Sequence, residues 1–223
     1  MSSIYETRFW TKSYNWKAPK TINYPKTFAY YIFRDAAAYH PDKVATWFYG
    51  AEMTYRELYR KVCRLANVFV EKGIKKGDRI GLLMPNCPQF VIAYWATLMA
   101  GAVVVNLNPL YTKEELRYLF NDADLSCVIA YDQLVPVLKE LNQEFKIPLV
   151  IITKLSDFML NTPVSTPEEL GLEEGWLHFS QLLETDRRWA PPLVDIKWDD
   201  PAVIQYTGGT TGIPKGAVLT QYN

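Results

Sequence analysis

Short, unbroken apolar runs separated by helix-like segments constrain the fold of this chain more than any other feature. Residues 103–105 read Val-Val-Val and residues 150–152 read Val-Ile-Ile, with no polar position that would mark a solvent-facing side. Strands without polar alternation are typical of parallel sheets that helices cover on both faces. Strand-helix-strand alternation with short links therefore predicts an α/β fold, doubly wound around a mostly parallel sheet.

Two capping boxes indicate where helices of this fold begin. Glu57 follows Thr54 by three positions, and Glu115 follows Thr112 by the same spacing. In such a box each side chain accepts a hydrogen bond from the backbone N–H of the other residue, which fixes the first turn of a helix. Helices are expected over residues 27–39, 55–73, 88–100, 113–121, 133–144 and 179–184, strands over 79–84, 102–105, 127–130, 149–153, 201–206 and 217–219, and a hairpin over 44–53.

Two stretches depart from this rhythm. Residues 154–198 contain four prolines and two glycines, which predicts a variable, loop-rich excursion with one short helix. Residues 1–26 form an N-terminal arm with five basic side chains and one acidic side chain, Glu6. We interpret both stretches as solvated surface, and the arm as lying outside the α/β portion at residues 27–223.

Composition excludes several classes of protein. The chain has 223 residues, 49% of them hydrophobic, and can bury a substantial core. Its 24 basic and 24 acidic side chains cancel, which argues against a nucleic-acid-binding protein. Three widely spaced cysteines and two distant histidines, without a C-x-x-C motif, argue against a zinc site or a disulfide framework.

The sequence predicts no transmembrane segment. Residues 81–112 lack charge, but prolines and a glycine interrupt them, and the longest apolar piece, residues 90–105, is shorter than the ~20 residues needed to cross a bilayer. No apolar segment typical of a signal peptide follows Met1. We therefore expect a cytoplasmic location, and peripheral association with a membrane remains open.

A run rich in glycine and threonine follows the apolar residues 202–204. Residues 206–216 read Tyr-Thr-Gly-Gly-Thr-Thr-Gly-Ile-Pro-Lys-Gly. The glycines let the backbone turn sharply and point several N–H groups into one concavity, while the threonines add hydroxyl donors and Lys215 adds a positive charge. Such a loop suits a polyphosphate. The candidate phosphate-binding residues are Thr207, Gly208, Gly209, Thr210, Thr211, Gly212 and Lys215.

This loop is neither of the common nucleotide-binding motifs. Lys215-Gly216 reverses the Gly-Lys order of a Walker loop, and no G-x-G-x-x-G is present. A flexible surface turn is the simpler alternative. For a phosphate-binding loop we expect an exposed segment near the carboxyl end of a strand, with Thr210 and Thr211 outside the core.

The run resembles the AMP-binding signature of the adenylate-forming superfamily, which includes acyl-CoA synthetases, aryl-CoA ligases, luciferases and adenylation domains. Residues 77–86 and 101–109 resemble two further segments of that superfamily, Gly-Asp-Arg-Ile with Met-Pro-Asn, and Gly-Ala with Asn-Pro. Together they look most like medium- or long-chain fatty acyl-CoA synthetases. Gln221 departs from the pattern, because it stands where the family usually has histidine.

The resemblance implies an ATP-dependent ligase that joins a fatty acid to coenzyme A through an acyl-adenylate. The loop would hold the β- and γ-phosphates of ATP, and Lys215, the one catalytic candidate, would neutralise the charge on pyrophosphate. The family's ligand for Mg²⁺ and its C-terminal domain belong to sequence beyond residue 223. We expect an N-terminal fragment that is inactive by itself and self-associates through apolar positions such as Val203, Val218 and Leu219.

Other functions stay open. The chain could be a non-catalytic module that binds nucleotide phosphates or a partner protein, or a complete small protein that uses only the loop. It could also belong to another branch of the superfamily, such as the aryl-CoA ligases or the adenylation domains. The sequence that follows residue 223 would discriminate between the enzyme and the module.

Overall fold

A computed structural model describes residues 6–22, 27–184, 189–207 and 214–223 of the chain. Within these residues a seven-stranded sheet has the order β7-β6-β5-β3-β4-β8-β9, and every neighbouring pair is parallel except β8 and β9. The strands are β3 (Arg79–Leu83), β4 (Val103–Leu107), β5 (Cys127–Tyr131), β6 (Leu149–Thr153), β7 (Leu177–His178), β8 (Pro201–Thr207) and β9 (Lys215–Thr220).

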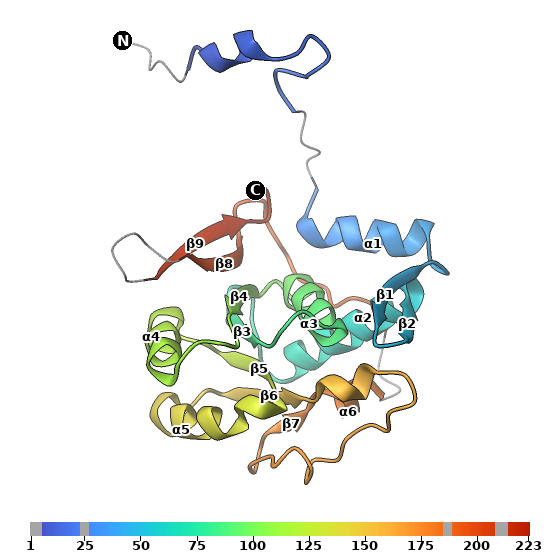
Figure 1. Cartoon of the computed structure of the whole chain (residues 1–223), viewed down its shortest axis with the longest axis vertical. Helices are drawn as coiled ribbons and strands as arrows, with labels where there is room; N and C mark the ends of the chain where they lie inside the picture. Colours follow the sequence, from blue (N-terminus) through green and yellow to red (C-terminus); the bar gives the residue numbers. More distant parts are fainter. Residues whose placement is uncertain (1–5, 23–26, 185–188, 208–213) are drawn as a thin grey trace.

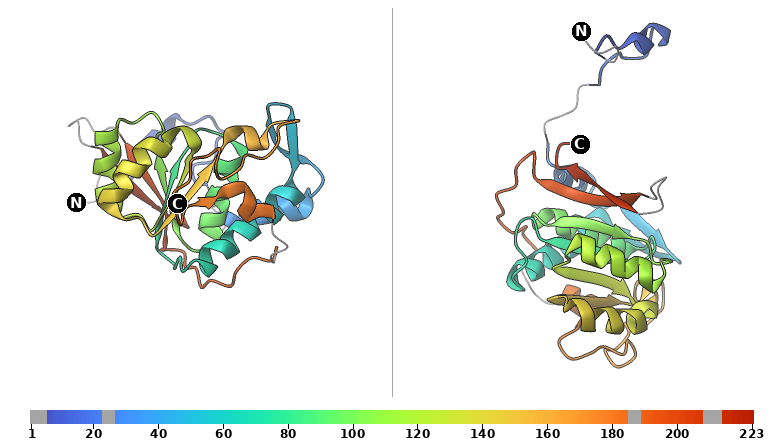
Figure 2. Two further views of the ribbon diagram at one scale, coloured as in Figure 1. Left: turned by 90° about the horizontal axis from the view of Figure 1, so that it is seen from below. Right: turned by 90° about the vertical axis from the view of Figure 1, so that its left-hand side faces the viewer.

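Helices cover the parallel part of the sheet on both faces (Figures 1 and 2). One face packs on α4 (Lys113–Ala123) and α5 (Val135–Phe145), and the other face packs on α2 (Tyr55–Glu71) and α3 (Pro88–Met99). The predicted doubly wound α/β fold is confirmed. The remaining elements are α1 (Ala29–Tyr39), α6 (Phe179–Glu184), the separate hairpin β1 (Val44–Phe48) with β2 (Ala51–Thr54), and the 3-10 turns η1 (Phe9–Ser13), η2 (Asp132–Leu134) and η3 (Leu155–Phe158).

The direction of winding changes between β3 and β5. The chain leaves β3 through α3 to reach β4 on one side, whereas it leaves β5 through α5 to reach β6 on the other side. The two helices lie on opposite faces of the sheet. Such a switch opens a crevice beyond the carboxyl ends of the strands, and open α/β sheets bind their ligands there.

Local sequence signals account for most helix boundaries. Thr54 and Thr112 are the N-caps of α2 and α4, and both capping boxes are formed with Glu57 and Glu115. Pro88 occupies the first turn of α3, where its missing N–H costs no hydrogen bond. These predictions are confirmed, with end points within a few residues of those expected.

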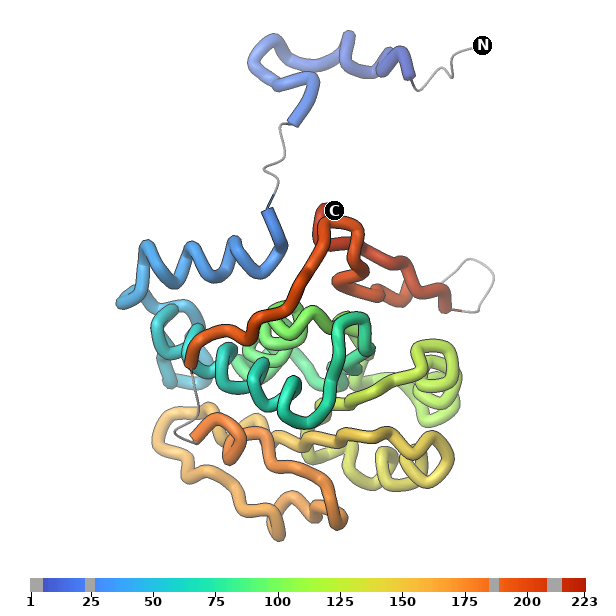
Figure 3. The backbone as a smooth tube through the Cα atoms, turned by 180° about the vertical axis from the view of Figure 1, so that it is seen from behind, coloured from blue at the N-terminus to red at the C-terminus, as the bar shows by residue number. Residues whose placement is uncertain are grey.

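The excursion at residues 154–198 contributes more to the sheet than its composition predicts. The short helix α6 is confirmed, but the prediction missed β7, which pairs in parallel with β6 and forms one edge of the sheet. Residues 189–200 then return along α2 to β8 (Figure 3). The Asn67 side chain donates to Ala190 O at 2.8 Å, and Lys76 Nζ donates to Asp195 O at 2.8 Å.

The other edge of the sheet is the antiparallel strand β9. Val218 and Leu219 on this strand are exposed, as expected of an uncovered edge, and self-association through them stays a prediction. The expectation for Val203 was wrong, because it pairs in the sheet interior between β4 and β9 and is buried. No helix of the described residues combines the length and the apolar character that crossing a membrane requires.

Candidate functional site

The candidate phosphate loop joins β8 to β9. In the antiparallel register Thr207, the last residue of β8, lies opposite Lys215, the first residue of β9, and both are exposed. Residues 208–213, which include Gly208, Gly209, Thr210, Thr211 and Gly212, lie outside the described residues. Thr207 ends β8 and Lys215 begins β9, so the two flanking residues lie where a loop between two strands was expected. The exposure expected for Thr210 and Thr211 stays a prediction.

Strand β8 places Thr207 at the carboxyl edge of the sheet. It pairs in parallel with β4, with Asn106 opposite Gln205, so the carboxyl ends of β3, β4, β5 and β8 lie at one edge. Gly216 allows the close pairing of β9, because a Cβ at this position would lie 2.8 Å from Ile204 Cγ2. The hairpin therefore carries Thr207 and Lys215 to the same edge as the crevice.

A cavity of about 590 Å³ lies at this crevice. It brings together residues from four strands: the residues after β3, the residues at the end of β4, the last residue of β5, and Gln205 of β8. Two of these segments, Met-Pro-Asn at residues 84–86 and Asn-Leu-Asn-Pro at residues 106–109, belong to the stretches that resemble the adenylate-forming superfamily. The sequence alone gave neither segment a place in a site. The residues that line the cavity are Met84, Pro85, Asn86, Phe90, Asn106, Leu107, Asn108, Pro109, Leu110, Tyr111, Tyr131 and Gln205.

Polar groups in this cavity are available to a ligand. Asn106 Nδ2 donates to Gln205 Oε1 at 2.9 Å, which orients both amides. Asn106 Oδ1 is buried and has no hydrogen-bond partner among the described residues. A buried acceptor without a partner costs free energy, so a donor supplied by a ligand would be favoured here. Gln205 precedes Thr207 by two positions, so the cavity lies near the first flank of the candidate phosphate loop.

Helix α4 holds both flanks of the loop. Tyr206 Oη donates to Asp122 Oδ2 at 2.6 Å, and Tyr118 Oη donates to Pro214 O at 3.3 Å. Burial, and then the hydrogen bond with Asp122, raises the pKa of Tyr206, so its hydroxyl remains a donor at neutral pH. Sequence reasoning missed these contacts, although the i, i+4 spacing of Tyr118 and Asp122 places them on one side of the helix.

Gln221 is buried just after β9. Its backbone N–H donates to Asp200 O at 3.0 Å, and Asp200 is paired with Lys76 at 2.6 Å. Gln221 Oε1 is buried and has no partner among the described residues. The position where the family usually has histidine therefore faces the interior of the described residues, not open solvent.

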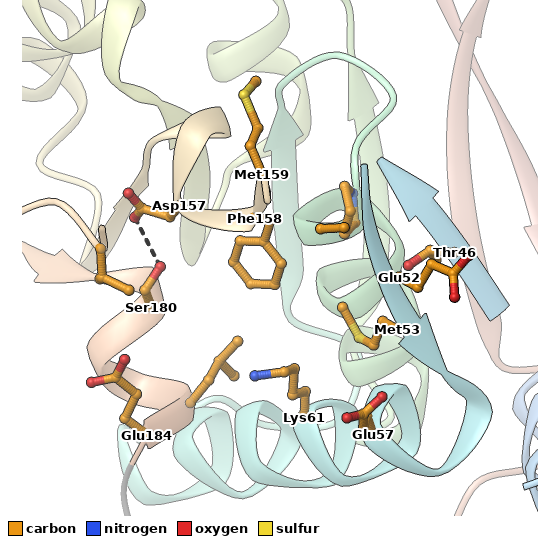
Figure 4. A pocket seen from close by; sticks show the side chains of 14 residues that line it. Thr46, Glu52, Met53, Glu57, Lys61, Asp157, Phe158, Met159, Ser180 and Glu184 are labelled. Carbon is orange, nitrogen blue, oxygen red and sulfur yellow. Dashed lines mark hydrogen bonds between the residues drawn. The ribbon is translucent and has the colours of Figure 1, made fainter. Parts of the chain in front are cut away.

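A second group of polar side chains lies in the excursion, beside a smaller cavity of about 240 Å³ (Figure 4). Asp157 Oδ2 accepts hydrogen bonds from Ser180 Oγ at 2.9 Å and from Ser165 Oγ at 3.0 Å, and lies 3.1 Å from His178 Nε2. Ser165 N–H donates to Asp157 Oδ1 at 2.9 Å. Serine, histidine and aspartate thus meet, as they do in hydrolytic enzymes.

This group does not have the geometry of a catalytic triad. A triad needs histidine between the serine and the aspartate, with one ring nitrogen for each. Here both hydroxyls donate to the carboxylate, and His178 Nδ1 is buried without a partner among the described residues. Burial alone would raise the pKa of Asp157, but the hydrogen bonds from His178, Ser165 and Ser180 outweigh it and lower that pKa. The group is a structural centre for the excursion.

Other nucleophile and metal chemistry finds no support among the described residues. Burial raises the pKa of Cys87 to about 11 and of Cys63 to about 12, so neither thiol is ionised near neutral pH. Cys127 is buried, and burial raises its pKa further. Within the same residues no three His, Cys, Asp or Glu side chains lie together as metal ligands would.

Comparison with known proteins identifies the family. The model of the family described as "AMP-binding enzyme" matches residues 33–223. The chain belongs to the AMP-binding enzyme family.

Its relatives in this family include CoA ligases. The chain is 34% identical to a long-chain-fatty-acid–CoA ligase of Bacillus subtilis, over 96% of this chain and 40% of that protein. It is 31% identical to a crotonobetaine/carnitine–CoA ligase of Salmonella paratyphi C, over 86% and 36%. Acetoacetyl-CoA synthetase from Streptomyces lividans matches the structure with a TM-score of 0.74 and 26% identity, over 87% of this chain and 30% of that one. The chain thus spans well under half the length of these AMP-binding relatives.

Proposed function

We propose that this chain is the N-terminal part of an ATP-dependent fatty acid–CoA ligase. The observation that carries the proposal is the position of Thr207 and Lys215, opposite each other at the carboxyl edge of the sheet, next to the cavity of about 590 Å³. The similarity to a long-chain-fatty-acid–CoA ligase over 96% of the chain supports a fatty acid as the substrate. The co-substrates are ATP and coenzyme A.

The proposed reaction has two steps. A fatty carboxylate oxygen attacks the α-phosphorus of ATP, the bond to the bridging oxygen breaks, and pyrophosphate leaves with the electron pair. The thiol of coenzyme A then attacks the acyl carbon of the adenylate, which yields the thioester and AMP with loss of the thiol proton. Negative charge grows on the leaving pyrophosphate in the first step, and this charge is what the loop can stabilise.

Lys215 and the loop residues supply that stabilisation in the proposal. Fixed donors aimed at developing charge lower the barrier by about 3 kcal/mol each in comparable sites. Lys215 has the charge and the exposed position to reach phosphate oxygens from β9. Tyr118 on α4 donates to Pro214 on one side of the loop, and Tyr206 on the other side donates to Asp122 on α4. In the proposal these two hydrogen bonds keep the phosphate donors oriented before ATP binds. The residues proposed to hold the β- and γ-phosphates are Thr207, Gly208, Gly209, Thr210, Thr211, Gly212 and Lys215.

In the proposal, magnesium enters only as the ion bound to ATP. The described residues contain no cluster of carboxylates or histidines that fits a metal ion, so we derive no step from Mg²⁺ here. In this reaction the role of the described residues is to bind and orient phosphate. We assign no general base, because a carboxylate nucleophile needs none.

ATP–pyrophosphate exchange tests the proposal. The longer protein that contains this chain should exchange labelled pyrophosphate into ATP only when an alkanoate is added. The same assay with benzoate, carnitine and amino acids serves as the comparison. Exchange driven by one of these acids and not by alkanoates would assign the chain to a different branch of the family.

The 223-residue chain by itself should form no acyl-CoA from ATP, magnesium, fatty acid and coenzyme A. Phosphate contacts alone leave few interactions to offset the entropy lost when ATP binds. Steady thioester formation by this chain would contradict its assignment as part of a larger enzyme. A longer protein without any exchange activity would instead favour the alternative of a non-catalytic nucleotide-binding module.

A further inference from the structure

A polar pair joins two interior strands at the carboxyl edge of the sheet. Asn106 on β4 lies opposite Gln205 on β8 in the parallel register, and Asn106 Nδ2 donates to Gln205 Oε1 at 2.9 Å. Both strands have neighbours on each side, with β3 beyond β4 and β9 beyond β8. Valine or isoleucine suits such a strand position at least as well. The stability of the sheet therefore does not require an amide pair at this point.

The Gln205 amide is held in one orientation. Its Nε2 donates to Tyr206 O at 3.3 Å, while its Oε1 accepts from Asn106. Rotation of this amide by half a turn would place its Nε2 against Asn106 Nδ2, a second donor, and its Oε1 against Tyr206 O, a second acceptor. The two hydrogen bonds together therefore fix the amide.

The backbone contact of Gln205 lies directly before the candidate phosphate loop. The carbonyl of Tyr206 and the N–H of Thr207 belong to one peptide group, which is planar. A donor that fixes Tyr206 O therefore fixes the plane from which the backbone of Thr207 continues. Gln205 and Thr207 also lie on one face of β8, because side chains two positions apart in a strand point the same way. The contact between Asn106 and Gln205 thus acts on Thr207, the first of the candidate phosphate-binding residues.

The opposite face of β8 is held separately. Tyr206 is buried, and its hydroxyl donates to Asp122 on α4 at 2.6 Å. The end of β8 is therefore fixed from both faces, by α4 through Tyr206 and by β4 through Gln205. Each of these contacts joins two described residues, so none of them requires an open crevice.

We propose that Asn106 is a positioning residue for the binding of ATP: through the Gln205 amide it orients the peptide group that leads into Thr207. The inference rests on the proposed function, because it gives Asn106 a part in the same reaction. Asn106 itself touches no phosphate in this proposal. Its loss should weaken the binding of ATP and leave the binding of the fatty acid unchanged.

ATP–pyrophosphate exchange by the longer protein tests the proposal. Asn106→Leu should raise KM for ATP about threefold, with a smaller change in kcat, because the lost hydrogen bond lies between exposed amides that water can also serve. KM for the alkanoate should stay unchanged. Gln205→Met removes the partner at an exposed position, where folding is little affected, and should have the same effect. The double variant should raise KM for ATP no further than either single variant, since all three break one chain of contacts.

Asn67→Leu is the matched control, because it makes the same substitution on α2. Asn67 Nδ2 donates to Cys63 O at 2.7 Å and to Ala190 O at 2.8 Å. This variant should lose stability in urea unfolding and keep the KM for ATP of the unchanged protein. Circular dichroism verifies that every variant is folded.

Three results would overturn this inference alone, each with alkanoate-dependent exchange intact in the unchanged protein. The first is an unchanged KM for ATP in Gln205→Met and in folded Asn106→Leu, which would show that the pair supports only the sheet. The second is an equal rise of that KM in Asn67→Leu. The third is a double variant whose increase is the product of the two single increases. A longer protein without alkanoate-dependent exchange would instead overturn the proposed function, and this inference with it.

Discussion

Two groups of polar residues differ in what surrounds them. The loop flanks at Thr207 and Lys215 are exposed at the carboxyl edge of the sheet, and the adjoining cavity holds a buried acceptor, Asn106 Oδ1, without a partner. Asp157, in the excursion, has a fully buried side chain that accepts from a backbone N–H and two hydroxyls. Its residue types look more catalytic than those of the loop. Both groups contain a buried polar atom without a partner, Asn106 Oδ1 in one and His178 Nδ1 in the other, so accessibility, more than residue type, distinguishes the candidate ligand site from the structural centre.

The largest effect should follow the loss of Lys215. In the longer protein, Lys215→Ala should lower fatty-acid-dependent ATP–pyrophosphate exchange about 100- to 1000-fold, because a charge that meets the leaving pyrophosphate is lost. Its stability should change by less than about 0.5 kcal/mol, since Lys215 is exposed. The exposed Lys43→Ala is the control and should exchange normally. A large loss of stability with normal exchange in Lys215→Ala would remove the difference between the two polar groups.

Asp157 should show the opposite behaviour. Asp157→Asn offers one acceptor oxygen where the carboxylate offers two, so at least one of its donors is left without a partner. Urea unfolding should show a loss of about 3 kcal/mol, and exchange by the folded variant should be unchanged. Asp42, whose side chain is 82% exposed, provides the control, and Asp42→Asn should cost less than about 1 kcal/mol. A folded Asp157→Asn protein without exchange activity would make this group a catalytic candidate.

The same carboxylate should make stability depend on acidity. Its pKa is lower in the folded chain than the ordinary value, so the stabilisation is complete above about pH 4 and is lost as pH falls through the folded-state pKa. The difference in unfolding free energy between the unchanged chain and Asp157→Asn should therefore be constant near neutral pH and should shrink below about pH 4. Urea midpoints measured across this range check the sign. A difference that grows on acidification would contradict it.

A smaller effect is expected where α4 holds the loop. Tyr206→Phe removes the 2.6 Å hydrogen bond to Asp122, which is worth about 1 kcal/mol because Asp122 is exposed and can turn to water. If the bond positions the phosphate donors, KM for ATP should rise about fivefold, with a smaller change in kcat. Tyr39→Phe, at a tyrosine that is 79% exposed, should leave both constants unchanged. A change confined to stability would show that α4 supports only the fold.

Local signals in the sequence determined the helices, the buried strands and the loop between β8 and β9. Capping boxes and Pro88 act over a few residues, and the apolar runs mark buried strands without showing which strands they pair with. Lys215 and Thr207 could be chosen from the same run because their chemistry and spacing are local.

Only the tertiary structure decided which distant residues meet. Tyr206 and Asp122 are 84 positions apart, and Asp157 and His178 are 21 apart. β7 is two residues long, too short to show a period in the sequence, and it is a strand because β6 offers it a partner. The cavity beside the loop likewise exists because the winding reverses between β3 and β5 and brings the carboxyl ends of several strands to one edge.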